Sequence, residues 1–240
     1  EGIVLNERPC DYYYVTPGHQ VPTGVTMSSA RRRQLLEHAA RHDAVIIEDD
    51  YDSESNFTLN PLPALKASDR SGRVVYVSSL SKALSPGLRL GFMVADPDLI
   101  DEARALRRLV YRHPPTNIQY QMAHFLAQGH YETHLRRYHY DSAQRWERLH
   151  AALQRYLPSC RALAGSEHAN AFWLQTPAQI NTQQLTWRAA HAGVLIEPGA
   201  RHFLSAAPPD NYFRMGFHAI NPDAIAQGVE VLRGQLEQMG

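Results

Sequence analysis

The residue types around Lys82 could do covalent chemistry. This lysine follows the apolar run 74–77, lies beside the hydroxyl groups of Ser79 and Ser81, and precedes Arg89 by seven residues. A neutral lysine amine can attack an aldehyde to form a Schiff base. Hydroxyl groups and a guanidinium are groups that bind phosphate. The set is therefore typical of a site for a phosphorylated aldehyde.

The scarcity of lysine supports this interpretation. Lys66 and Lys82 are the only lysines among the 24 lysine and arginine residues of the chain. Because arginine keeps its proton in proteins, a chain that otherwise uses arginine has a chemical reason to keep an amine at position 82. The alternative is a structural lysine in a loop, which is the commoner use of this residue type.

An acidic cluster could complete such a site. The apolar run Ala44–Ile47 is typical of a buried strand and leads directly into Glu48–Asp52. An unpaired carboxylate at the edge of a buried sheet is costly, so a protonated pyridine nitrogen would be a fitting partner for Asp49. Tyr51 could then bind the ring oxygen. A solvated turn and a divalent-metal site are the alternatives for this cluster.

Arg214 is a third candidate, because it lies within the apolar segment 212–217. An arginine in an apolar strand is costly unless it meets a carboxylate or a phosphate. It could bind the carboxylate of a ligand, or it could pair with a local acidic residue. His38 and His42 are four residues apart on an expected helix, but surface histidines explain them better than a metal pair, and we expect no metal site.

The elements that must position these residues follow an α/β pattern. Apolar runs and breakers predict strands at 11–16, 44–47, 74–77 and 89–95, and a helix that begins at Ser28 or Ser29 and ends near His42. This order predicts a parallel sheet with right-handed crossovers, to which the fourth strand adds antiparallel. The loops that start near residues 17, 48 and 78 should therefore open on one edge of the sheet and converge on one crevice.

The second half of the chain has a different character. Its pattern predicts helices at 97–111, 116–129 and 132–157, then short strands at 171–174, 194–196 and 212–215 with helices at 182–192 and 222–238. We therefore expect a partial large domain over 1–135 and a smaller C-terminal α+β domain over 136–240.

Composition argues against several classes of function. The chain has 24 basic and 24 acidic residues, so no net field attracts nucleic acid or an anionic membrane. No apolar run approaches the ~20 residues needed to span a bilayer. Two cysteines, Cys10 and Cys160, suit a reducing cytoplasm, where we expect the protein to reside. Because the chain opens at Glu1 without Met, we expect a fragment of a longer protein.

Three segments together resemble a known family. They are Thr-Pro-Gly-His-Gln-Val-Pro-Thr-Gly at 16–24, Ile-Glu-Asp-Asp-Tyr-Asp-Ser-Glu at 47–54 and Ser-Lys-x-Leu-x-Pro-Gly-Leu-Arg-Leu-Gly at 81–91. They are similar to the aminotransferase-like domain of MocR/GabR-type transcription regulators of the GntR superfamily. The resemblance implies a fold type I, aminotransferase-like α/β fold, with a mostly parallel sheet flanked by helices, and pyridoxal 5'-phosphate as the cofactor.

The resemblance also implies a role for each matching residue. Lys82 would form the internal aldimine, Asp49 would pair with the pyridine nitrogen, and Tyr51 would pair with the ring hydroxyl. The remaining assignments are the phosphate to Ser79, Ser81 and Arg89, a ligand carboxylate to Arg214, and the ring oxygen to the loop that carries His19 and Gln20.

The leading hypothesis is a ligand-sensing domain of a bacterial transcription regulator, rather than an enzyme. Pyridoxal phosphate held as a Schiff base on Lys82 would meet an amine or amino-acid effector, and closure of the small domain would signal to an N-terminal winged helix-turn-helix that binds DNA. The resemblance also implies a homodimer. A catalytically active aminotransferase of the same fold is the alternative. A metal-dependent hydrolase that uses Glu48, Asp49 and Asp52 is a third hypothesis.

Overall fold

The chain folds into two compact units, each with its own sheet. The computed structural model describes residues 5, 10–52, 54, 61–80, 82–163 and 171–239. The first unit comprises Glu1–Gln20 and Thr26–His139, and the second comprises Val21–Val25 and Tyr140–Gly240. Within the described residues, no helix is long and apolar enough to cross a membrane.

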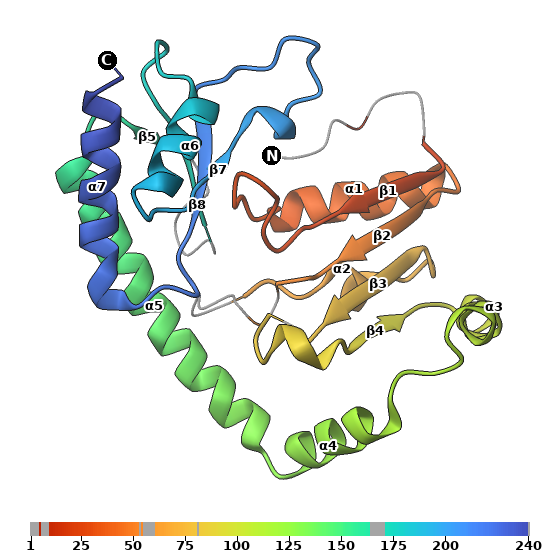
Figure 1. The fold of residues 1–240 in the computed structure, drawn as a ribbon. Coiled ribbons are helices and arrows are strands. Elements are labelled where there is room, and N and C mark those ends of the chain that lie inside the picture. The colour runs from red at the N-terminus through yellow and green to blue at the C-terminus, as the bar shows by residue number, and fades with distance from the viewer. Residues whose placement is uncertain are drawn as a thin grey trace. The chain divides into compact units, whose positions relative to one another are not determined.

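A four-stranded sheet organises the first unit (Figure 1). Its strands are β1 (Tyr12–Val15), β2 (Val45–Asp49), β3 (Val74–Ser79) and β4 (Gly91–Val94), in that spatial order. The first three strands run parallel, and β4 pairs with β3 antiparallel. This arrangement confirms the predicted mixed α/β sheet.

Burial alternates along β1 and β2, as the two-residue period of a strand requires. Their buried residues pack with the helix α1 (Ser29–Arg41) and the segments around it into the core of the unit. The members of this core are Tyr13, Val15, Met27, Leu35, Ala39, Ala44, Ile46, Leu65 and Val74. The opposite face is open at Tyr12 and Tyr14, whose side chains are 68% and 65% exposed.

Among the described residues, five α-helices begin in the first unit, and local sequence explains the ends of α1. The helix α1 begins after Ser28, whose hydroxyl accepts a hydrogen bond from the Arg31 N–H, and its last turn is closed by the N–H of His42. This confirms the predicted cap and helix. The helices are α1 (Ser29–Arg41), α2 (Leu65–Ser68), α3 (Pro97–Val110), α4 (Thr116–Ala127) and α5 (His130–Tyr156), with a short 3₁₀ turn, η2, at Pro86–Leu88. The boundary between the units falls within α5.

The second unit has an antiparallel sheet with the strand order β5-β6-β8-β7 (Figure 1). Phe172 and Phe213, on the two central strands, are fully buried in its core. The strands are β5 (Arg161–Ala162), β6 (Ala171–Gln175), β7 (Glu197–Pro198) and β8 (Tyr212–Gly216). The helices are α6 (Thr182–His191) and α7 (Ile225–Glu237), with 3₁₀ turns η3 (Ala200–His202) and η4 (Pro222–Ala224).

The prediction of a strand at 194–196 is wrong, because these residues do not form a strand. Val194 instead donates its N–H to the carbonyl of Ala189 at 2.8 Å, and so closes the end of α6. The strand β7 starts only at Glu197. It is followed by Gly199, where a Cβ atom would lie 2.5 Å from the Trp173 ring. Only glycine fits this approach of the chain to the aromatic core.

Candidate functional site

The three parallel strands of the first unit end at one edge of its sheet. Val15 of β1 lies opposite Glu48 of β2, and Asp49 lies opposite Val77 of β3. The segments that follow these strands therefore leave the sheet on the same side, which is where ligands bind in open α/β sheets. This confirms the convergence of loops predicted from the sequence.

Lys82 lies between a carboxylate and an aromatic ring at this edge. Its Nζ is 3.1 Å from Oδ1 of Asp52 and 4.3 Å from the centroid of the Tyr51 ring. The Lys82 side chain is 42% exposed, whereas the side chain of Asp52 is 3% exposed. The structure thus brings Lys82 together with Tyr51, and leaves the lysine side chain partly exposed.

His19 anchors both neighbours of Lys82. Its Nδ1 lies 3.0 Å from Oδ2 of Asp52, and its backbone carbonyl accepts a hydrogen bond from the Tyr51 hydroxyl at 3.2 Å. Both the His19 and the Asp52 side chains are 3% exposed. Sequence reasoning considered Asp52 only as a metal ligand, because nothing in the string of acids shows which one turns towards the lysine.

Asp49 has a partner that the sequence did not suggest. The hydroxyl of Tyr14 donates a short hydrogen bond to Oδ2 of Asp49. This bond, followed by burial and the negative charge of Asp49, raises the pKa of Tyr14 to about 12. The alternation along β1 was the available signal, because Tyr14 lies opposite Ile47 and so shares a sheet face with Asp49.

The other acids of the cluster have separate roles. Glu48 is fully buried, and its two carboxylate oxygens accept hydrogen bonds from the N–H groups of Leu65 and Lys66 at 2.7 and 2.9 Å. Burial raises the pKa of Glu48, against the effect of these two bonds. Asp50 accepts a hydrogen bond from the Tyr76 hydroxyl at 2.8 Å. Across the described residues, no group of three or more His, Cys, Asp or Glu side chains could hold a metal ion.

The expected phosphate-binding residues lie at the end of β3 and beyond it. Ser79 and Arg89 line a groove of about 900 Å³ in the first unit, together with Arg104 and Arg107. Arg89 adopts the left-handed conformation, with φ of 49°. Ser81 lies outside the described residues.

The other expected residue of the first loop, Gln20, accepts a hydrogen bond from the Thr16 hydroxyl at 3.0 Å. Gln20 therefore stabilises the segment that leaves β1. Its neighbour His19, rather than Gln20, contacts Asp52.

The helix α5 holds the turns that carry Asp52 and Lys82. His134 Nε2 lies 2.6 Å from the carbonyl oxygen of Ala83, the residue after Lys82. The hydroxyl of Tyr131 donates to a carboxylate oxygen of Glu54 at 2.6 Å, and His139 Nε2 lies 2.7 Å from the Glu54 carbonyl. The first turns of α5 are thereby linked to both segments of the candidate site.

Arg214 belongs to the second unit and pairs with a local acid. Its Nη1 lies 3.3 Å from Oε2 of Glu197. The other carboxylate oxygen of Glu197, Oε1, contacts Arg201 and His202. Burial alone would raise the pKa of Glu197, but the hydrogen bonds from Arg201 and His202 and the charges of Arg201 and Arg214 bring this pKa below its usual value. The local ion pair is thus one of the two arrangements that the sequence left open.

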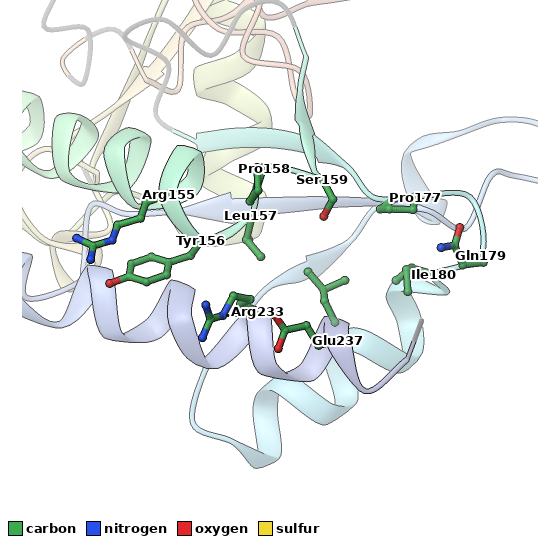
Figure 2. A pocket seen from close by; sticks show the side chains of 11 residues that line it. Arg155, Tyr156, Leu157, Pro158, Ser159, Pro177, Gln179, Ile180, Arg233 and Glu237 are labelled. Atoms are coloured by element: carbon green, nitrogen blue, oxygen red, sulfur yellow. Dashed lines mark ion pairs between the residues drawn. The ribbon is translucent and has the colours of Figure 1, made fainter.

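A separate pocket of about 420 Å³ lies in the second unit (Figure 2). The Tyr156 ring lies near the guanidinium groups of Arg155 and Arg233, at 5.2 and 5.8 Å from its centroid. Arg233 also pairs with Glu237 at 3.6 Å. The lining, as far as the structure describes it, includes none of the site residues expected from the sequence.

The described residues of the first unit include the chemical groups that pyridoxal phosphate requires, although the groove lined by Ser79 and Arg89, as far as its lining is described, does not include Lys82, Asp49 or Tyr51. They offer an amine at Lys82, a carboxylate at Asp49 that could face a pyridine nitrogen, and a phenol at Tyr51. Ser79 and Arg89 add the hydroxyl and guanidinium groups that bind phosphate. These are the chemical groups that the cofactor requires.

Comparisons with known proteins agree with this chemistry. The family model for aminotransferase class I and II matches residues 15–232. The HTH-type transcriptional regulator TauR of Rhodobacter capsulatus is 39% identical over 95% of this chain and 47% of its own length. The probable rhizopine catabolism regulatory protein MocR of Rhizobium meliloti is 34% identical over 92% of this chain and 44% of its own length. The chain thus spans about half the length of these curated relatives.

Several solved structures of aminotransferases resemble the chain. LysN, an α-aminoadipate aminotransferase from Thermus thermophilus, was solved in complex with N-(5'-phosphopyridoxyl)-L-leucine. It is 27% identical, with a TM-score of 0.87 over 95% of this chain and 59% of that protein. The fold and the cofactor class expected from the sequence are therefore confirmed.

Proposed function

We propose that this chain, which belongs to the aminotransferase class I and II family, is the aminotransferase-like domain of a MocR-type transcription regulator in a bacterium and senses an amine or amino-acid effector. The observation that carries the proposal is the Lys82 amine, held at the carboxyl edge of the sheet by Asp52 and Tyr51. Two of its relatives, at 39% and 34% identity, are regulators.

Six residues of the first unit have a proposed role in binding the cofactor. Lys82 would hold pyridoxal phosphate covalently, with Asp49 at the pyridine nitrogen and Tyr51 at the ring oxygen. Ser79, Ser81 and Arg89 would bind the phosphate. When bound, the cofactor supplies an aldehyde that amines can exchange on and a ring that withdraws electrons.

Asp49 is prepared for its task by Tyr14. The hydroxyl of Tyr14 already donates to Oδ2 and so fixes the orientation of the carboxylate. Oδ1 of Asp49 could then accept a second donor, the protonated pyridine nitrogen. A carboxylate at this position keeps the nitrogen protonated and so maintains the electron-withdrawing character of the ring.

The effector would be recognised through its amine, which would compete with Lys82 for the aldehyde carbon. Arg214 of the second unit is the proposed partner of an effector carboxylate, which would compete with Glu197 for it. The single Arg214–Glu197 contact is 3.3 Å long, so four of the five guanidinium N–H donors are not used in it. A carboxylate ligand could therefore gain a two-point contact that Glu197 does not make.

The helix α5 offers a route for the signal. Its first turns contact Ala83 and Glu54, and the same helix continues into the second unit. We propose that the first unit is the large cofactor-binding domain, that the second is the small domain, and that closure of the small domain is relayed to a winged helix-turn-helix that binds DNA. A homodimer is part of this proposal.

The experiment compares DNA binding with turnover. The full-length gene product, loaded with pyridoxal phosphate, is tested on the promoter region of its own gene with a panel of amino acids and simple amines. A sensor should bind that DNA with an affinity that changes with one ligand, and Lys82→Arg should remove the ligand dependence. DNA affinity that is the same with every ligand, in a protein that carries the cofactor, would contradict the proposal.

An active aminotransferase is the second candidate. It is favoured by the TM-score of 0.87 to LysN, because a sensor and an enzyme of this fold share the cofactor residues. Multiple-turnover exchange of an amino group between an amino acid and a keto acid, without ligand-dependent DNA binding, would identify the enzyme.

A further inference from the structure

The side chain of Asp52 is placed unusually for an acid that has no assigned role. It is 3% exposed, and each of its oxygens faces a different nitrogen. Oδ2 is 3.0 Å from Nδ1 of His19, and Oδ1 is 3.1 Å from Nζ of Lys82. A buried carboxylate is costly unless it is paired, and here both pairs point to functional positions.

The support behind Asp52 is rigid. His19 is itself buried and braces two groups at once, since its ring contacts Asp52 and its carbonyl accepts from Tyr51. The loop that carries His19 is held in turn by Arg32, a buried residue whose guanidinium donates to the carbonyls of Pro17 and Met27 at 2.8 and 2.9 Å.

The Lys82 side chain, in contrast, would be mobile without its two neighbours. Its side chain is 42% exposed, and a long lysine side chain keeps many rotamers when it is solvated. The Asp52 carboxylate on one side and the face of the Tyr51 ring at 4.3 Å on the other restrict it. The rigid partner therefore determines where the mobile amine lies.

We propose that Asp52, braced by His19, is a positioning residue that holds the Lys82 amine at the place where the aldehyde of the cofactor arrives. This inference rests on the proposed cofactor role of Lys82. In its neutral form the Lys82 amine would add to the aldehyde carbon, and the aldehyde oxygen would leave as water with the two protons of the amine. An amine that is already aligned with its reaction partner reacts faster than one that must first be ordered. The Asp52 carboxylate and the Tyr51 ring also cover the amine on two sides, and so shield it from small reagents that have no binding site.

These two effects predict changes of opposite sign when the carboxylate is removed. In Asp52→Asn, covalent capture of pyridoxal phosphate at Lys82 should become slower, by about tenfold or more at saturating cofactor. Acylation of Lys82 by a small reagent should become faster relative to Lys66, by about threefold, which is the scale of a partly exposed ion pair.

The test uses the full-length gene product without cofactor, at one fixed pH. In the first arm, limited acetic anhydride labels the amines, and peptide mass spectrometry compares Lys82 with Lys66 in the same sample. In the second arm, pyridoxal phosphate is added, samples are quenched with borohydride over time, and the modified Lys82 peptide is counted. Half-saturation by the cofactor should change little, because the phosphate contacts remain.

Two further variants act as controls. Asp223→Asn removes an exposed carboxylate that pairs with Arg148 in the second unit, and it should change neither arm. Asp52→Glu keeps the charge but moves it by one methylene group, so acylation should stay near the wild-type level while capture remains slow. If Asp52→Asn does not fold, Asp52→Glu still tests the positioning.

The outcomes are distinguishable. Faster acylation together with faster capture would mean that Asp52 merely restrains the amine, and would overturn the positioning role. Equal rates in wild type and Asp52→Asn would overturn it as well. If the wild-type protein captures no cofactor on Lys82, the proposed function fails, whereas the acylation arm still reports on the Asp52–Lys82 pair.

Discussion

Replacing Asp49 with asparagine should change the titration of Tyr14. The Tyr14 hydroxyl donates to Oδ2 of Asp49, and this bond is the main reason why the pKa of Tyr14 rises from 10.0 to about 12. Deprotonation of Tyr14 would place a negative phenolate beside the Asp49 carboxylate. It would also remove the hydrogen bond that the phenol donates. Two pKa units correspond to a change of about a hundredfold in the ratio of phenol to phenolate.

The assay is the ultraviolet absorbance of tyrosinate after rapid pH jumps, recorded before the protein unfolds. The chain has 12 tyrosines, so the Tyr14 signal is isolated by subtracting the curve of Tyr14→Phe. We expect a midpoint near 12 in the wild-type difference curve. In Asp49→Asn, compared with its own Tyr14→Phe double variant, the midpoint should move back towards 10.

The sign of the linkage can be checked separately. Because the folded state raises the pKa of Tyr14, the pair stabilises the fold below pH 10, and this contribution disappears as the pH rises through about 12. Tyr14 is 65% exposed, so solvent screening keeps the effect on the free energy of unfolding small. A wild-type midpoint near 10, or one that Asp49→Asn leaves in place, would refute the pairing.

Three predictions concern stability and use urea denaturation. Glu48→Gln replaces one of the two oxygens that accept from Leu65 and Lys66, so the free energy of unfolding should fall by about 2 kcal/mol. Because burial raises the pKa of Glu48, the wild-type advantage should be largest in acid and shrink as the pH rises through that raised pKa. Arg32→Met removes bonds to three backbone carbonyls and should cost about 3 kcal/mol, whereas Arg33→Met, at an exposed position of the same helix, should change stability by less than about 0.5 kcal/mol. Gly199→Ala should destabilise by about 2 kcal/mol through its clash with Trp173, whereas Gly234→Ala, within α7 and with open space around it, should stabilise by up to about 1 kcal/mol. Equal effects within either matched pair would contradict the packing described for it.

Much of the fold could be predicted because its signals are local. Ser28 caps α1, apolar runs form the parallel strands, and Pro97 begins α3, each close to the predicted position. The strand at 194–196 was misplaced because β-branched residues there suggest a strand, while the actual use of Val194 is to close α6 against Ala189. That choice depends on tertiary contacts that no local pattern records.

The candidate site could be predicted only in part. The period of a strand places Glu48 and Asp49 on opposite faces of the sheet, which explains why one caps α2 and the other meets Tyr14. Beyond Asp49 the strand ends, so no strand period predicts where the side chain of Asp52 points. Likewise, Glu197 becomes the partner of Arg214 through the pairing of β7 with β8, which a strand placed at 194–196 does not predict.

Covalent attachment of the cofactor to Lys82 can be measured directly. The full-length gene product is incubated with pyridoxal phosphate, reduced with borohydride and digested, and the modified peptides are identified by mass spectrometry. Within this chain, we expect a phosphopyridoxyl group on Lys82, none on Lys66, and loss of the label in Lys82→Ala. A label on Lys66, or its absence from Lys82 at saturating cofactor, would contradict the assignment of Lys82 as the site of attachment.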